Sequence, residues 1–288
     1  MNDLRVRRKS FNVSIFNIKI LPQELNVDYT DQYIDLFKRL YSENIAANTR
    51  GDKWMEIRTQ FSHEGDSVLY GKLIYYTILD GKDWYNRREK TLQQVDLGND
   101  LYPNAKEIEY YFIPKAHRFC FINKTNGIAM SQIEIFLKKS LSRLLDEDME
   151  VAVYKELTSD IIDRIISAPK LFRLEIGISY TNNDLSDEFE KLWDDEMKEG
   201  KIHELKLNAK SFKSDSINLE NSNVLKGALK LSQSNGFAEA TIQAEDGKNE
   251  NVSTIDYPRR ELISTTEGNE HRDVYSKIMS IFRHGQRG

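Results

Sequence analysis

Basic residues next to aromatic residues give the clearest indication of what this chain could bind. The segment WYNRREK contains Trp84, Tyr85, Arg87, Arg88 and Lys90. Arginine and lysine neutralise phosphates, and aromatic rings stack on nucleobases. The segment therefore predicts a contact with nucleic acid, and the alternative is an ordinary solubilising loop.

Three other basic clusters could join the same contact. They are Arg5, Arg7, Arg8 and Lys9 near the start, Arg259 and Arg260 in YPRRE, and Arg283, His284 and Arg287 at the end. From these we predict that Arg7, Arg8, Arg259 and Arg260 bind nucleic acid together with the WYNRREK segment. A shared binding surface requires the clusters to gather on one face of the fold.

A second kind of chemistry is suggested by His117 and Arg118 in PKAHRF, which follow Pro114 at the end of a predicted strand. A histidine can move a proton and an arginine can stabilise phosphate charge, so the pair could support RNA cleavage without a metal. A histidine held by hydrogen bonds at a turn is the alternative interpretation.

Metal and cofactor chemistry finds little support in the sequence. Glu204 and Lys206 form an E-x-K pattern preceded by Glu175, as in some magnesium nucleases, but alternating charges also occur on any solvated strand face. The histidines lack metal-ligand spacing, and no glycine-rich phosphate loop is present. Cys120 lies between two phenylalanines, which predicts a buried and inert thiol. We expect no metal, no cofactor and no catalytic activity.

The composition is that of a globular protein in a reducing compartment. The 288 residues are 39% hydrophobic and 30% charged, with a net charge of −5 and one cysteine. This charge excludes a wholly basic nucleic-acid coat but allows a local basic patch. The chain shows neither an N-terminal apolar segment nor the ~20-residue apolar run that a membrane span needs. We therefore expect a cytoplasmic protein with no membrane contact.

An aromatic stretch over residues 54–122 predicts the strands that position these side chains. Residues 11–20 alternate but change phase, which predicts a bulge near Ile15. Asp80-Gly81 predicts a two-residue hairpin turn directly before WYNRREK. Ser131 and Glu134 form an S-x-x-E pattern, which predicts the start of a helix.

Helices and strands together predict an α+β fold with mixed, largely antiparallel sheets covered by helices. After Asp148 the pattern changes to an alternation of strand and helix. This change favours two sheet-and-helix halves, residues 1–149 and 150–288, and a single continuous domain is the alternative. Both faces of the strand over residues 69–76 are apolar, so the aromatic stretch is expected to be core.

Three segments carry a resemblance to a known family. FNVSIFNIKI, VLYGKLIYYTILDGKDW and YYFIPKAHRFCF, followed by a helix, resemble an uncharacterised bacterial domain-of-unknown-function family over residues 10–145. The resemblance implies a setting in mobile islands near phage-defence genes, and it implies no catalytic residue.

These observations favour a non-enzymatic nucleic-acid-binding component, of DNA or RNA, in a bacterial anti-phage defence or mobile-element system. One alternative is an RNA-cleaving toxin or effector that uses His117 and Arg118. The other is a protein-interaction subunit of a homo- or hetero-oligomeric complex, such as a homodimer assembled through exposed sheet edges.

Overall fold

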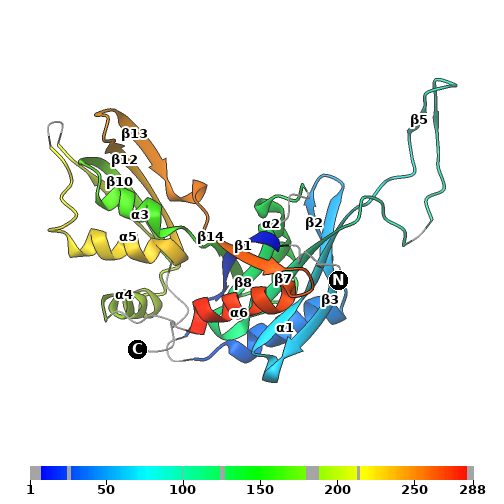
Figure 1. Ribbon diagram of the computed structural model, residues 1–288, viewed down its shortest axis with the longest axis horizontal. Helices are drawn as coiled ribbons and strands as arrows, with labels where there is room; N and C mark the ends of the chain where they lie inside the picture. Colours follow the sequence, from blue (N-terminus) through cyan, green and yellow to red (C-terminus); the bar gives the residue numbers. More distant parts are fainter. Residues whose placement is uncertain are drawn as a thin grey trace, which may run out of the picture.

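The computed structural model of the protein describes residues 8–24, 27–98, 100–123, 127–179, 188–212 and 215–283. A large sheet forms the centre, a smaller sheet with its own helices lies to one side, and a slender arm projects from the opposite side (Figure 1). Every strand pairing in the described residues is antiparallel. The predicted α+β class is confirmed.

The large sheet has eight strands. Seven follow one another in the order β14 (Arg260–Thr266), β1 (Arg8–Leu21), β8 (Arg118–Asn123), β7 (Lys106–Ile113), β4 (Val68–Thr77), β3 (Lys53–His63) and β2 (Ala47–Arg50). The eighth, β9 (Glu150–Lys155), pairs with β1 beyond the end of β14. The long β1 strand thus has two partners on one edge and β8 on the other.

Apolar side chains from both faces of this sheet are buried. The inner face packs on α1 (Thr30–Ser42) and α2 (Met130–Ser142), with Phe37 and Phe136 fully buried. The outer face is covered in part by α6 (Glu270–Arg283), through Val274 and Ile278. Because β1 is covered on both sides, its apolar residues change face without any irregularity. The predicted bulge near Ile15 is wrong, since the β1–β8 register runs unbroken from Asn12 to Asn17.

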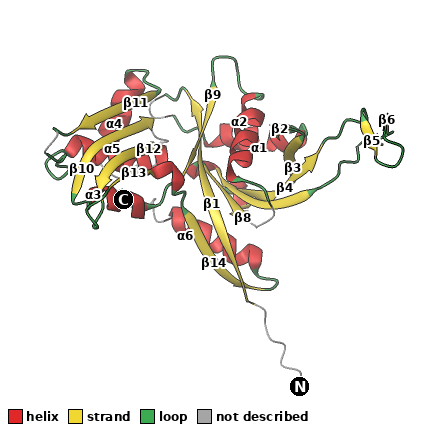
Figure 2. Cartoon of the chain, turned by 90° about the horizontal axis from the view of Figure 1, so that it is seen from above, coloured by secondary structure: helices red, strands yellow, loops and turns green. Residues whose placement is uncertain are grey.

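The smaller sheet has the order β11 (Glu204–Lys210), β10 (Lys170–Ser179), β12 (Gly236–Gln243) and β13 (Asn249–Ser253). The helices α3 (Ser159–Ile166), α4 (Glu188–Glu199) and α5 (Asn223–Asn235) pack on it around a separate apolar cluster. Figure 2 shows this group on the far side of β1 from the arm. The predicted boundary at residue 149 stays a prediction, although β9, β14 and α6 follow it in the sequence and lie in or on the large sheet.

Two local predictions differ from the structure. The helix α2 begins at Met130 and not after Ser131, because Gln132 accepts a hydrogen bond from the Ala129 backbone N–H at 2.9 Å. Asp80-Gly81 makes no hairpin turn, since β4 ends at Thr77 and pairs with β7 beyond a long excursion. The chain reverses at residues 87–90 instead, between β5 (Trp84–Asn86) and β6 (Thr91–Gln93).

Three short 3-10 helices complete the described part of the chain. They are η1 (Glu64–Asp66), η2 (Pro114–Ala116) and η3 (Thr254–Asp256). Within the described residues, no helix is both long enough and apolar enough to span a membrane.

Candidate functional site

The excursion between β4 and β7, residues 78–105, is named the arm. It leaves the edge of the large sheet and ends in the β5–β6 pair, well apart from the rest of the molecule (Figure 1). The two stems are joined by hydrogen bonds from the Val95 N–H to the Gly81 carbonyl at 2.8 Å and from the Thr77 N–H to the Pro103 carbonyl at 3.0 Å. The arm is therefore a hydrogen-bonded hairpin, and its tip, residues 84–93, is presented to solvent.

Local hydrogen bonds hold the reversal at the tip. The Asn86 side-chain oxygen accepts from the backbone N–H groups of Arg88 and Glu89, both at 3.1 Å. The Asn86 carbonyl accepts from the Lys90 N–H at 2.7 Å, and Lys90 has a φ of 56°. This Asx-type turn fixes the backbone while leaving the charged side chains outside.

The aromatic and basic residues of WYNRREK gather at this tip, as the sequence predicts. Trp84 and Tyr85 are 38% and 62% exposed, although the Trp84 indole N–H is fixed by the Asp80 carbonyl at 2.6 Å. Arg87, Arg88 and Lys90 are exposed, and they form no ion pair within the described residues. Their positive charge is thus available to a partner.

The other predicted basic residues do not join the tip. Arg8 and Arg260 are exposed at opposite ends of the β1–β14 pairing, where they face Thr266 and Ser14. Figure 2 shows β14 and the arm on separate parts of the molecule. Arg7 lies outside the described residues, as do Arg5, His284 and Arg287, and the Arg283 side chain is also not described.

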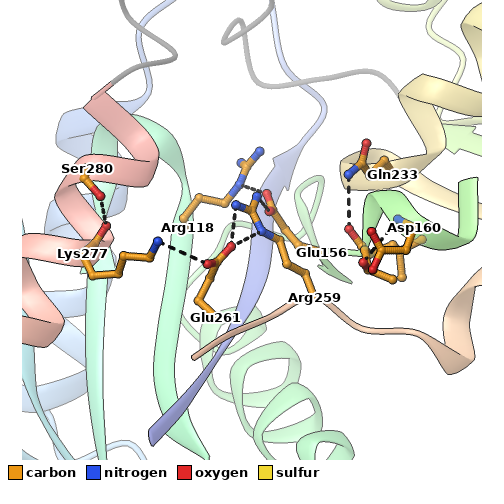
Figure 3. A network of polar contacts seen from close by, with 10 residues as sticks. Arg118, Glu156, Asp160, Gln233, Arg259, Glu261, Lys277 and Ser280 are labelled. Carbon is orange, nitrogen blue, oxygen red and sulfur yellow. Dashed lines mark hydrogen bonds and ion pairs between the residues drawn. The ribbon is translucent and has the colours of Figure 1, made fainter. Parts of the chain in front are cut away.

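Arg259 belongs instead to an ion network that is buried at Arg118 and Glu156 and partly exposed elsewhere (Figure 3). Glu156 is bound by the Arg118 guanidinium on one side and by Arg259 Nη1 at 3.2 Å on the other. Arg259 also contacts Glu261 at 2.8 Å, and Lys277 of α6 reaches Glu261 at 3.7 Å. The network joins β8, the segment after β9, β14 and α6, so its role is to hold these elements together.

His117 and Arg118 are directed to different surroundings. His117 follows η2 with a φ of 54°, and its ring stacks on Tyr33 of α1 with centroids 4.3 Å apart. Arg118 is 6% exposed and binds Glu156 and the Ala116 carbonyl. The two side chains do not meet at a common point where a phosphodiester could lie between them.

The candidate metal-binding residues and the single cysteine have defined positions in the fold. Glu175 and Glu204 lie on neighbouring strands, but their Cα partners are Asn208 and Ser179, so they sit several residues apart along the β10–β11 pairing. Within the described residues no group of three or more metal-binding side chains forms. Cys120 is fully buried, and burial raises the pKa of its thiol well above the ordinary value.

A cluster that the sequence analysis did not find lies on the outer face of the large sheet. Two histidines, His63 of β3 and His271 of α6, have ring centroids 5.7 Å apart and stack with 20° between their planes. Both rings contact Tyr70 at 4.6 Å. The Tyr111 hydroxyl forms a 2.8 Å hydrogen bond with His271 Nδ1. No sequence spacing links residues this far apart, so the sequence carried no signal for this cluster.

This cluster predicts a dependence of stability on pH. Burial lowers the pKa of His271 below 6.5, and the neighbouring His63 adds to the effect against a weaker opposing influence of Glu109. Between the lowered pKa and 6.5 the unfolded chain binds more protons than the folded protein. Stability due to this group is therefore complete above about pH 6.5, falls as the pH drops through that window, and levels off below the lowered pKa.

Thermal unfolding of the wild type and of His271→Gln at about pH 7.5 and about pH 5.5 measures this contribution. We expect the wild type to lose more stability than His271→Gln between the two pH values. His203→Gln is the control, because His203 is half exposed beside Glu150 and belongs to a different surface. Equal losses in the wild type and His271→Gln would contradict the assignment.

Comparison with known proteins places this fold in a family. The family model described as Domain of unknown function (DUF4747) matches residues 9–280. A search of curated proteins gave no match. The match includes the three segments over residues 10–145 that carry the resemblance, and it extends through the arm, both sheets and most of α6. The protein therefore belongs to the DUF4747 family of domains of unknown function.

Proposed function

We propose that this protein is a non-enzymatic nucleic-acid-binding component of a bacterial anti-phage defence or mobile-element system. The observation that carries the binding is the arm tip, where Trp84 and Tyr85 stand exposed beside Arg87 and Arg88. The biological setting rests on the resemblance read from the sequence.

The position of the tip supports contact with a polyanion. A hairpin that projects from the body can enter a groove or follow a strand without a clash from the rest of the fold. The arginines lie in the turn of a hairpin whose backbone is fixed, so little order has to be gained on binding. Since the whole chain carries a net charge of −5, binding depends on this local cluster of positive charge.

The direct test removes the two arginines. We expect Arg87→Ala/Arg88→Ala to weaken binding to a labelled oligonucleotide by about tenfold at moderate salt, because two phosphate contacts are lost. The slope of log affinity against log salt should fall by about 1.5, since each contact contributes about 0.7 to 0.9. Fluorescence anisotropy over a salt series measures both quantities.

A matched control is available on the smaller sheet. Lys210→Ala/Lys248→Ala removes the same charge from two exposed positions far from the arm, and it should leave affinity and slope nearly unchanged. Equal weakening by both double variants would show a non-specific effect of total charge. A wild-type protein that binds neither DNA nor RNA at low salt would refute the proposal.

A second candidate function is that of a protein-interaction subunit, and the apolar surface of the arm favours it. Leu92 and Leu101 are 67% and 81% exposed. At the root of the arm, Leu79, Leu97 and Leu101 line a hollow of about 880 Å³. Exposed apolar groups of this size often mark protein contacts, so the arm could also hold a partner or a second copy of the chain.

A further inference from the structure

The arm carries a large share of the exposed apolar surface. Seven of the sixteen large hydrophobic residues that are exposed in the described chain belong to it, and Tyr85, Leu92 and Leu101 are 62%, 67% and 81% exposed. Within the described residues the β5–β6 pair has no third strand beside it, and it stands apart from the body (Figure 1). A two-stranded hairpin alone is marginally stable in water, and further strands or a packed apolar face stabilise it. The arm is therefore suited to packing on a partner.

Charge is divided along the length of the arm. The tip, residues 84–93, has a net charge of +2 from three cations and one carboxylate, namely Arg87, Arg88, Lys90 and Glu89. The two stems, residues 78–83 and 94–105, have a net charge of −3 from four carboxylates and one cation, namely Asp80, Asp83, Asp96, Asp100 and Lys82. All these side chains are exposed, and they form no ion pair within the described part of the chain. The arm thus has a basic end and an acidic end, and neither is neutralised by the chain itself.

Apolar side chains lie between the two charged parts. Asp80 and Asp96 lie beside the 2.8 Å hydrogen bond that joins the stems. Tyr85 of β5 pairs with Leu92 of β6 farther out, and the basic turn follows. From stem to tip the order is therefore acidic, apolar and basic. Such an order is self-complementary, because a two-fold rotation places the acidic part of one copy beside the basic part of another and the apolar part beside itself.

We propose that two copies of this chain associate through their arms in antiparallel orientation, with the tip of each arm along the stems of the other. Arg87 and Arg88 of one copy then face Asp80 and Asp96 of the other, and each ionic contact is made twice by symmetry. A nucleic acid is complementary to the tip alone, since the acidic stems repel phosphates. A second copy is complementary to the whole arm.

This proposal rests on the second candidate function, and it names the partner and its orientation. It also affects the nucleic-acid binding proposed for the tip. The same arginines cannot bind phosphates and the aspartates of a second copy at once, so association of the arms competes with oligonucleotide binding.

The test exchanges the charges of the two parts. Arg87→Glu/Arg88→Glu makes the whole arm acidic, and Asp80→Lys/Asp96→Lys makes it basic. Each variant alone should dimerise about 100-fold more weakly than the wild type or worse, because like charges now face each other. An equimolar mixture should form a heterodimer about as stable as the wild-type dimer, since both of its tip-to-stem contacts join opposite charges. Sedimentation velocity over a concentration series measures all four samples, and misfolded variants could not restore association to each other.

A control reverses two charges away from the arm. Lys210→Glu/Lys248→Glu changes exposed positions on the smaller sheet and should leave the dimer unchanged. The proposal is overturned by a wild type that is monomeric at every concentration, by a dimer that neither arm variant weakens, or by a mixture that does not associate. Oligonucleotide binding is measured separately by anisotropy. A wild type that dimerises in this way and binds no nucleic acid would refute the proposed nucleic-acid binding and leave the arm dimer standing.

Discussion

The substitution Glu156→Gln should lower the free energy of unfolding by about 3 kcal/mol or more. Glu156 is 6% exposed, and it lies between the guanidinium groups of Arg118 and Arg259. Glutamine keeps the size of the side chain and removes its charge. Because Arg118 is itself buried, its cation would lose the negative charge of Glu156 in a medium of low polarity.

Urea and thermal unfolding of the purified protein measure this effect. At about 2–4 °C per kcal/mol for a domain of this size, the midpoint temperature should fall by about 6–12 °C. Glu43→Gln serves as the control, because Glu43 pairs with Arg39 at 2.8 Å on the surface and such pairs contribute less than about 1 kcal/mol. A loss for Glu156→Gln as small as that for Glu43→Gln would show that the network does not hold the fold together.

A double substitution separates the charge from the packing. Arg118→Met/Glu156→Leu removes both buried charges of the pair and leaves Arg259 with Glu261. Replacing a buried ion pair by apolar side chains is often neutral, so this variant should be more stable than Glu156→Gln. If it is less stable, the hydrogen bonds of the network matter more than its charge balance.

Gly71→Ala is the second substitution with a large expected effect. Gly71 of β4 pairs with Gln60 of β3, next to an irregularity where the register shifts between Ile57 and Thr59. An added Cβ would lie 1.9 Å from the Thr59 carbonyl oxygen. A backbone atom cannot rotate away as a side chain does, so β3 and β4 must move apart and lose pairing. Overpacking costs about 1–3 kcal/mol, and this contact belongs at the upper end or above.

The urea midpoint decides this prediction, and Gly98→Ala is its control. A Cβ at Gly98 meets no atom within 4 Å, so the change should stay within about 0.5 kcal/mol. Unchanged stability of Gly71→Ala would mean that the irregularity in β3 relaxes at little cost.

Local pattern predicted much of the secondary structure and little of the connectivity. The strand around LIYYT and the helix from Thr30 occur where periodicity places them. The Asp80-Gly81 pair has the chemistry of a hairpin turn, yet in the fold it lies in one stem of the arm, opposite Val95. Turn chemistry shows where a chain can reverse, and the strand that β4 pairs with is chosen by packing across the whole sheet.

For the candidate site residues too, the sequence predicted some positions and not others. The WYNRREK residues lie together because they are neighbours in the chain, so their meeting at the tip follows from the sequence. In the sequence nothing distinguishes Arg259 from an ordinary surface arginine, but the fold places it beside two carboxylates. His117 and Arg118 are adjacent in the sequence and face different environments, because successive residues near a strand start point to opposite sides.

By itself, the sequence determined the α+β class, the buried aromatic strands and the basic aromatic segment, because these depend on contacts between residues close in the chain. Only the tertiary structure decided that the arm projects, that Arg259 is paired with two carboxylates, and that His63 and His271 meet beside Tyr70. The physical reason is that long-range pairing is set by the summed burial of many side chains. The pattern of a short stretch of residues therefore does not predict which strands pair or which distant side chains meet.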